Sequence, residues 1–83
     1  MHYIHKNSGT CSTQVEFDLE DGIIHNVIYM GGCNGNLKAL GALVEGMTAD
    51  EAIKRMRGIK CGMKQTSCSD QLARALEEAL NDK

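Results

Sequence analysis

Residues 13–30 read TQVEFDLEDGIIHNVIYM, and this stretch decides the fold of the chain. In its first half apolar and polar residues alternate, which is the period-two pattern of a half-buried strand. Asp21-Gly22 tolerates the positive φ angles of a two-residue type I′ turn, and the returning run from Ile23 to Met30 is rich in β-branched residues. The stretch therefore predicts an antiparallel β-hairpin.

The two-residue turn also predicts the register of the hairpin, because it makes the numbers of paired residues add up to 43. One face of the hairpin is then almost wholly apolar. The expected pairs are Leu19 with Ile24, Val15 with Ile28, and Thr13 with Met30.

Two cysteines fall at the open end of this hairpin. The same register places Cys11 opposite Gly32, and Cys33 follows one residue later. Strict alternation would point the two thiols to opposite faces, but Gly31 and Gly32 can bend the chain and turn Cys33 inward. We expect these glycines to shape the backbone so that the two thiols share one end of the sheet.

One short strand and three helices are expected around the hairpin. Residues 2–6 can form an edge strand. From Asn36 to Met47 apolar residues recur at helical spacing, with Asn34 or Asn36 as the N-cap and Gly46 as the stop.

The next two helices have clear start signals. Thr48-Ala49-Asp50-Glu51 is a capping box, in which the threonine accepts from the third amide and Glu51 reaches back, and this helix should run to about Arg57. The last helix should begin near Ser67 or Ser69, with one apolar stripe that Cys68 extends by a turn. The stripe consists of Leu72, Leu76 and Leu80. Residues 1–83 are thus expected to form a single α+β domain, a small antiparallel sheet packed against about three helices.

Composition limits what this domain can do. A chain of 83 residues buries only roughly 60 to 65% of its unfolded surface, so its core is marginal and a metal or cross-link is worth proportionately more. The net charge of -2 argues against nucleic acid or an anionic membrane as the main partner. No apolar run is long enough for a membrane span, and the first residues lack the apolar stretch of a secretory signal. We therefore expect a cytosolic protein.

In the cytosol thiols stay reduced, so four cysteines indicate metal binding or redox chemistry rather than structural disulfides. Cys61 and Cys68 lie in GIKCGMKQTSCSD, residues 58–70, where Gly62 can shape the loop. Cys33 and Cys68 fall at expected helix starts, which favour the thiolate. Four thiolates fit a tetrahedral Zn²⁺ or an iron site, although the spacings match no zinc finger or ribbon. The hypothesis rests on the placement of the cysteines at element ends.

Several polar and sulfur-containing residues have alternative interpretations. Cys61 is the cysteine that could most easily be a core residue. Asp70 can complete a Ser67-x-x-Asp70 helix cap or lie near the metal as an acceptor behind the ligands. The histidines are more often surface or pairing residues than ligands, and four methionines fall at core-like positions. These are His2, His5 and His25, and Met30, Met47, Met56 and Met63.

The segment Thr66-Ser67-Cys68-Ser69-Asp70 resembles the TSCPD-domain family. The segments around Cys11, Gly31–Gly35 and Cys61-Gly62 look like the same family, so the resemblance covers nearly the whole chain. Ser69 stands where the family name has proline, which would serve there only to start the helix. The family comprises small bacterial proteins similar to a C-terminal extension of adenosylcobalamin-dependent ribonucleotide reductases.

That family often carries the label ribonucleoside-diphosphate reductase. A chain of 83 residues cannot hold the barrel, radical site and nucleotide pocket of a reductase, so the label implies kinship to an accessory domain. We do not expect reductase activity from this chain alone.

A looser resemblance concerns iron-sulphur cluster assembly scaffolds of the NifU type, which use three cysteines. They would correspond to Cys11, Cys33 and Cys68, and they imply a sheet with helices on one side. Thr13 and Ser67 stand where the scaffolds have an aspartate and a histidine. Cys61 could replace the histidine as fourth ligand, which would favour a permanent site over transient assembly.

The sequence therefore favours a cysteine-rich metal-binding domain, with zinc as the expected metal and an unidentified protein partner in ribonucleotide reduction or cluster assembly. The alternatives are an iron-sulphur scaffold or carrier, and a thiol redox protein in which Cys61 and Cys68 exchange disulfides with a partner.

Overall fold

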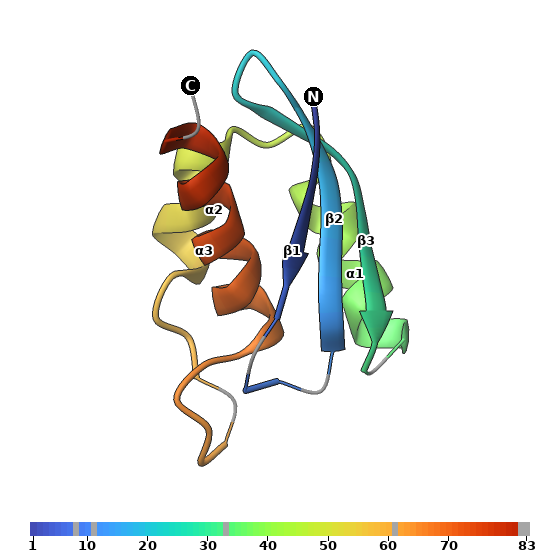
Figure 1. Ribbon diagram of the computed structural model, residues 1–83, viewed down its shortest axis with the longest axis vertical. Coiled ribbons are helices and arrows are strands. Elements are labelled where there is room, and N and C mark those ends of the chain that lie inside the picture. The colour runs from blue at the N-terminus through green and yellow to red at the C-terminus, as the bar shows by residue number, and fades with distance from the viewer. Residues whose placement is uncertain (8, 11, 33, 61, 82–83) are drawn as a thin grey trace.

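A computed structural model describes residues 1–7, 9–10, 12–32, 34–60 and 62–81. Within them the chain forms three strands followed by three helices, and the predicted α+β class is confirmed. Figure 1 shows the strands side by side, with α2 and α3 on the β1 side of the sheet and α1 behind β2 and β3. The elements are β1 (His2–Lys6), β2 (Ser12–Glu20), β3 (Ile23–Gly31), α1 (Asn34–Val44), α2 (Ala49–Met56) and α3 (Cys68–Asn81).

The sheet is antiparallel throughout, in the order β1-β2-β3. β1, the expected edge strand, pairs with β2 in an unbroken register from His2 opposite Asp18 to Lys6 opposite Gln14. The hairpin turn forms at Asp21 and Gly22, whose φ angles of 51° and 78° suit the predicted turn.

The register of the hairpin follows the prediction only near this turn, where Leu19 lies opposite Ile24. Beyond Asp18 the pairing shifts by one residue, so that Val15 lies opposite Tyr29 and not Ile28. The predicted Thr13–Met30 pair is also wrong, since Gln14 takes the place of Thr13.

The first shift is a β-bulge at Asn26, which adopts a φ of 56°. The Asn26 amide donates to Glu45 Oε1 at 2.8 Å, and a contact of this kind is invisible in the alternation pattern. Beyond the bulge β3 presents Val27 and Tyr29 to the core, whereas Ile28 is 53% exposed. The predicted apolar face is therefore built from different residues of β3.

A second shift lies near the start of β2, between Ser12 and Gln14. Thr13 is the extra residue, and it is exposed. Ser12 consequently turns inward and is only 2% exposed, although the predicted alternation would have placed it outside.

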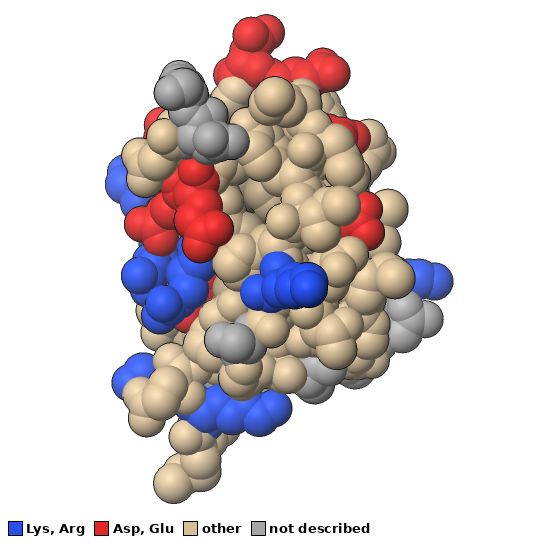
Figure 2. Space-filling model, in the orientation of Figure 1, with Lys and Arg blue, Asp and Glu red and all other residues tan. Residues whose placement is uncertain are grey.

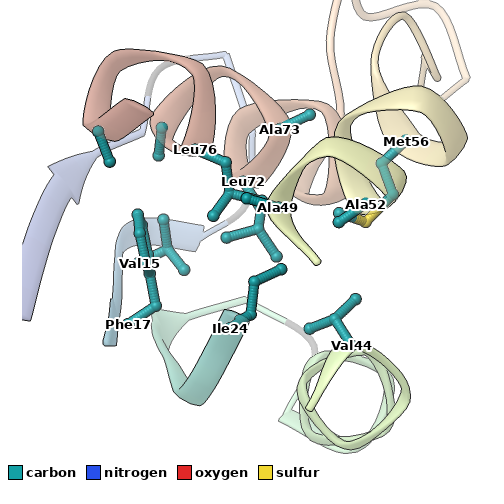
Figure 3. Packing of buried hydrophobic residues seen from close by; sticks show 12 residues of the cluster. Val15, Phe17, Ile24, Val44, Ala49, Ala52, Met56, Leu72, Ala73 and Leu76 are labelled. Carbon is teal, nitrogen blue, oxygen red and sulfur yellow. The ribbon is translucent and has the colours of Figure 1, made fainter. Parts of the chain in front are cut away.

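The core lies between the inner face of the sheet and the three helices. Figure 3 shows Val15, Phe17 and Ile24 pointing from the sheet toward Leu72 and Leu76 of α3. All five are fully buried, and burial of such a side chain contributes about 1.5–3 kcal/mol. The leucine stripe predicted for α3 is thus part of the core.

The helix ends lie close to their predicted positions. α2 starts after Thr48, whose Oγ1 accepts from the Glu51 amide at 3.3 Å, but the Glu51 carboxylate accepts from Arg55 instead of reaching back. α2 ends at Met56 with Arg57 as the C-cap.

Only part of the methionine prediction holds. Met56 is buried and Met47 packs against the core. Met30 and Met63 are 48% and 99% exposed, so their assignment to the core was wrong.

α1 packs unusually close to β3 at Gly41. A Cβ built on this buried glycine would lie 3.1 Å from the carbonyl oxygen of Val27 and 3.6 Å from its Cβ. The missing side chain therefore sets the distance between α1 and the sheet.

Candidate functional site

Cys68 is the first residue of α3 and lies at the end of the sheet where β2 begins and β3 ends. Its Sγ is 3.0 Å from the hydroxyl oxygen of Ser12, and Ser12 pairs with Gly31. We call this end of the molecule, residues 7–12, 29–34 and 57–70 as far as the structure describes them, the cysteine end. Cys11, Cys33 and Cys61 themselves lie outside the described residues.

Besides its contact with Cys68, Ser12 is hydrogen-bonded to Asn7 and Thr10. Its Oγ accepts from Asn7 Nδ2 at 2.8 Å, and its carbonyl oxygen accepts from Thr10 Oγ1 at 2.9 Å. Asn7 Oδ1 is buried and has no hydrogen-bond partner among the described residues. Sequence reasoning did not single out Ser12, because only the second register shift turns it toward Cys68.

Tyr29 fixes the backbone of Cys68 from the other side. Its hydroxyl donates to the carbonyl oxygen of Cys68 at 2.8 Å. Burial raises the pKa of Tyr29 far above its ordinary value, and the nearby charge of Cys68 raises it further, so the phenol stays a donor. Tyr29 was also missed, since its inward direction depends on the bulge at Asn26.

The glycines expected to shape the backbone adopt conformations that suit glycine. Gly31, Gly32 and Gly62 have φ angles of 76°, 79° and 56°. Only glycine adopts this region at little cost, so the chain bends where β3 leads into α1 and again in the loop before α3.

Ser67 joins that loop to the start of α3. Its Oγ accepts from the Asp70 amide at 3.1 Å, as an N-cap does, and donates to the carbonyl oxygen of Ile59 at 2.6 Å. The hydroxyl therefore ties the residues on both sides of the loop together.

The carboxylate of Asp70 lies at the centre of a polar cluster and is fully buried. Oδ1 accepts from the Gly58 amide at 2.7 Å, and Oδ2 accepts from Thr66 Oγ1 at 2.5 Å and from Arg74 Nε at 2.9 Å. Arg57 contributes a longer contact of 3.4 Å. The carboxylate thus joins the end of α2, the loop and α3, a role wider than either one expected from the sequence.

Two opposing influences set the ionisation of Asp70. Burial by itself would raise its pKa, but hydrogen bonds from Thr66, Gly58 and Arg74, together with the charge of Arg74, lower the pKa to about 2. The carboxylate is therefore ionised at neutral pH.

Each of the three histidines has polar side-chain partners. His2 is within 2.9 Å of both Glu16 and Asp18, and His25 Nδ1 lies 2.6 Å from Glu45. His5 Nε2 lies 3.2 Å from Gln71 Oε1. Among the described residues no three His, Cys, Asp or Glu side chains are grouped closely enough to hold a metal ion. The four-cysteine site stays a prediction.

Charge is distributed unevenly over the surface. In the view of Figure 2, Lys and Arg gather over the lower half, toward the α2–α3 loop seen in Figure 1, and Asp and Glu gather over the upper half. Lys60 and Lys64 of that loop are exposed. The α2–α3 loop, which leads to Cys68 in the sequence, therefore presents positive charge to solvent.

Within the described part of the chain, no helix has both the length and the apolar character needed to cross a bilayer.

Comparison with known proteins identifies one relationship. Neither a curated protein nor a solved structure matches the chain significantly, so the resemblance to iron-sulphur scaffolds receives no support. The family model of the TSCPD domain matches residues 1–80, which is nearly the whole chain. This match agrees with the motif around Cys68, and the chain belongs to the TSCPD-domain family.

Proposed function

We propose that this protein is a metal-binding accessory domain in which Cys11, Cys33, Cys61 and Cys68 hold one Zn²⁺. It would serve a system linked to ribonucleotide reduction without being a reductase itself. Membership of the TSCPD family supports the link, because this family is similar to a C-terminal extension of adenosylcobalamin-dependent ribonucleotide reductases.

The observation that carries the proposal is the contact between Ser12 Oγ and Cys68 Sγ at 3.0 Å. Ser12 is the sequence neighbour of Cys11, and it pairs with Gly31, two residues before Cys33. Both cysteines are therefore close in sequence to described residues of the cysteine end. Ser67, next to Cys68, is hydrogen-bonded to Ile59, two residues before Cys61. Contacts between described residues thus relate Cys68 to the sequence neighbours of all three other cysteines.

The chemistry of the donor set fits zinc. Thiolates are preferred ligands of Zn²⁺, and four of them complete a tetrahedral structural site. Two features of the described residues favour a thiolate at Cys68, the partial positive charge of the α3 N-terminus and the adjacent Ser12 hydroxyl. When bound, the ion would cross-link strands, loop and helix in a domain whose core is small.

Metal analysis of a series of single cysteine variants tests this proposal. We expect about one zinc per chain in freshly purified protein, and loss of most of it in Cys11→Ser, Cys33→Ser and Cys68→Ser, because a neutral hydroxyl is a poor ligand. Cys61→Ser should lose less if its thiol is replaceable, and equal loss at all four positions would establish a closed site. Ser12→Ala is the matched control, since it removes the polar contact with Cys68 and leaves all four thiols. Full zinc retention in Cys68→Ser contradicts the proposal.

The same preparation distinguishes the alternatives. A brown protein from anaerobic purification would indicate an iron-sulphur cluster and a scaffold or carrier function. A metal-free, colourless protein whose count of reactive thiols falls with mild oxidant would indicate thiol redox chemistry, with Cys61 and Cys68 as the exchanging pair.

A further inference from the structure

The outer edge of β1 has no strand partner in the described part of the chain. β1 is the first strand of the sheet, and its neighbour there is β2. Unpaired edges carry rows of free amide and carbonyl groups that can pair with another chain. No described backbone group outside β2 bonds to β1, although α3 lies against its inward-facing side chains, where His5 contacts Gln71 and Glu78.

The hydrogen bonds between β1 and β2 show which backbone groups face this edge. Met1 and Leu19 exchange both of their bonds, at 2.8 and 2.9 Å, and the Asn7 amide donates to Thr13. Bonded and non-bonded pairs alternate along an antiparallel ladder, and the β1–β2 register is unbroken. Odd-numbered residues of β1 therefore bond to β2. The amides and carbonyls of His2, Ile4 and Lys6 point outward.

The outward-facing backbone groups of these three residues can pair with the same groups of a second copy of β1. If a second copy of β1 pairs antiparallel about an axis at Ile4, then Ile4 lies opposite Ile4, and His2 lies opposite Lys6. All three are positions with free backbone groups, so each facing pair can exchange two hydrogen bonds. A one-residue shift of register would place already bonded groups at the interface.

The side chains on the outer face fit the same pairing. Ile4 is 60% exposed, and the pairing would cover it with its own counterpart. His2 sits between Glu16 and Asp18, so the N-terminal end of the edge is acidic, while its other end carries Lys6. An antiparallel second copy places its Lys6 opposite His2, with Glu16 and Asp18 one strand further in. The carboxylates that bond to His2 offset the positive charge there, and the long lysine side chain can extend past His2 toward them.

The inner side of the edge also has room for another strand. A groove of about 300 Å³ runs between β1 and α3, bordered by Tyr3 and His5 on one side and by Ala75, Glu78 and Ala79 on the other. Inward-facing side chains of an added strand would enter this groove. The groove therefore leaves space between β1 and α3 for side chains of the added strand.

We propose that this protein self-associates into a twofold dimer through antiparallel pairing of β1 with β1, centred on Ile4, which forms a six-stranded sheet. The inference does not use the metal site, because it rests on the backbone register of β1 and on residues 2–6, none of which is a proposed ligand. The interface is a short one, so the dimer is expected to be concentration-dependent and weak rather than obligate.

Sedimentation velocity over a range of protein concentrations tests the proposal. Any purification tag should be placed at the C-terminus, because residues added before Met1 would continue β1 and change the edge that is being tested. We expect reversible dimers in the unmodified sequence, and dissociation constants raised roughly tenfold or more in Ile4→Lys, since two like charges then face each other. Ile28→Lys is the matched control. Ile28 is 53% exposed on the same outer face but lies two strands away from the edge.

Mixing two variants separates pairing from damage to the fold. Ile4→Lys and Ile4→Glu should each be monomeric, and their mixture should form heterodimers because the facing charges become opposite. Amide exchange of the unmodified protein should slow at Ile4 and Lys6 on dimerisation, while Tyr3 and His5 stay unchanged. A chain that is monomeric at every concentration overturns the proposal. So does a dimer that Ile4→Lys leaves intact, because its interface would then lie elsewhere.

Discussion

The two ends of the sheet are held together by different kinds of contact. At the turn end, residues 20–26 and 45–49, backbone groups bond to one another: Gly46 donates to Ile24, Ile24 to Met47, and Ala49 to Gly22, all within 2.9 Å. At the cysteine end, side chains of Asn7, Ser12, Tyr29, Ser67 and Asp70 make the connections. Backbone bonds therefore contribute directly to the turn end, where the Glu45 side chain adds a bond from the Asn26 amide, whereas the connections at the cysteine end depend on side chains.

The largest expected effect is metal removal. Structural thiolate sites contribute on the order of 10 kcal/mol of apparent binding free energy, comparable with the whole stability of a small domain. Chelation should lower the melting temperature sharply, and amide exchange should speed up first at the cysteine end. An unchanged melting curve after verified metal removal would contradict this prediction and would indicate that the cysteines are ordinary core residues.

The second effect is that of Asp70→Asn, for which we expect a loss of about 2–3 kcal/mol in the free energy of unfolding, because a buried charged acceptor disappears. This exceeds the roughly 0.5–1 kcal/mol of a simple helix cap. Denaturant unfolding measures it, with Asp50→Asn in the exposed first turn of α2 as the control. A loss as small as that of the control would mean that Thr66, Gly58 and the arginines find equivalent partners.

The pH dependence of stability sharpens the same test. The pKa of Asp70 is about 2 in the folded chain and 3.8 without its partners. Because the pKa of Asp70 is lower in the folded chain than in the unfolded chain, its ionised carboxylate stabilises the fold at any pH above the unfolded pKa. This contribution is lost as the pH falls from about 4 to about 2. The unmodified protein should lose stability over this window, and Asp70→Asn should lose visibly less.

At the turn end the largest response is expected from Asn26→Val. A β-branched residue at a φ of 56° costs about 1–2 kcal/mol, whereas glycine adopts this angle freely. Asn26→Gly is therefore the matched control and should stay close to the unmodified protein. If both variants unfold at the same denaturant concentration, the bulge is not maintained by the conformation of residue 26.

The smallest effect concerns Thr48→Ala, which removes an N-cap and should cost about 1 kcal/mol. Thr48→Ser retains the hydroxyl and should cost much less. Amide exchange at the cysteine end should be the same in both variants, because the backbone bonds of the turn end stay in place. Faster exchange at Ser67 or Asp70 in Thr48→Ala would show that the two ends are coupled.

Local patterns predicted most of the architecture. Alternation and the Asp21-Gly22 turn predicted the hairpin, and the leucine spacing and capping signals predicted α3 and α2 to within a few residues. The bulges were missed because each depends on a contact between residues distant in sequence, such as the Asn26 amide with Glu45. Once β3 shifts by one residue, a different set of its side chains faces inward.

The candidate site was predicted less completely for the same reason. Cys68, Ser67 and Asp70 were recognisable from the motif at the start of α3. Ser12 and Tyr29 were not, because strict alternation turns both away from the core and only the register shifts reverse them. Arg74, four residues after Asp70, was the available sequence signal that this carboxylate has a partner within its own helix.

Gly41 has a consequence for how this sequence can vary. A methyl group at this position would have to displace either the Val27 carbonyl or the whole of α1, since it would approach that oxygen to 3.1 Å. In a saturation library, position 41 should accept fewer residue types than most fully buried leucine positions, because no repacking of side chains relieves a clash with backbone. If a bulkier residue at position 41 moves α1 away from β3, we expect the shift to extend to Asn34, the first residue of the helix, which follows Cys33 in the sequence.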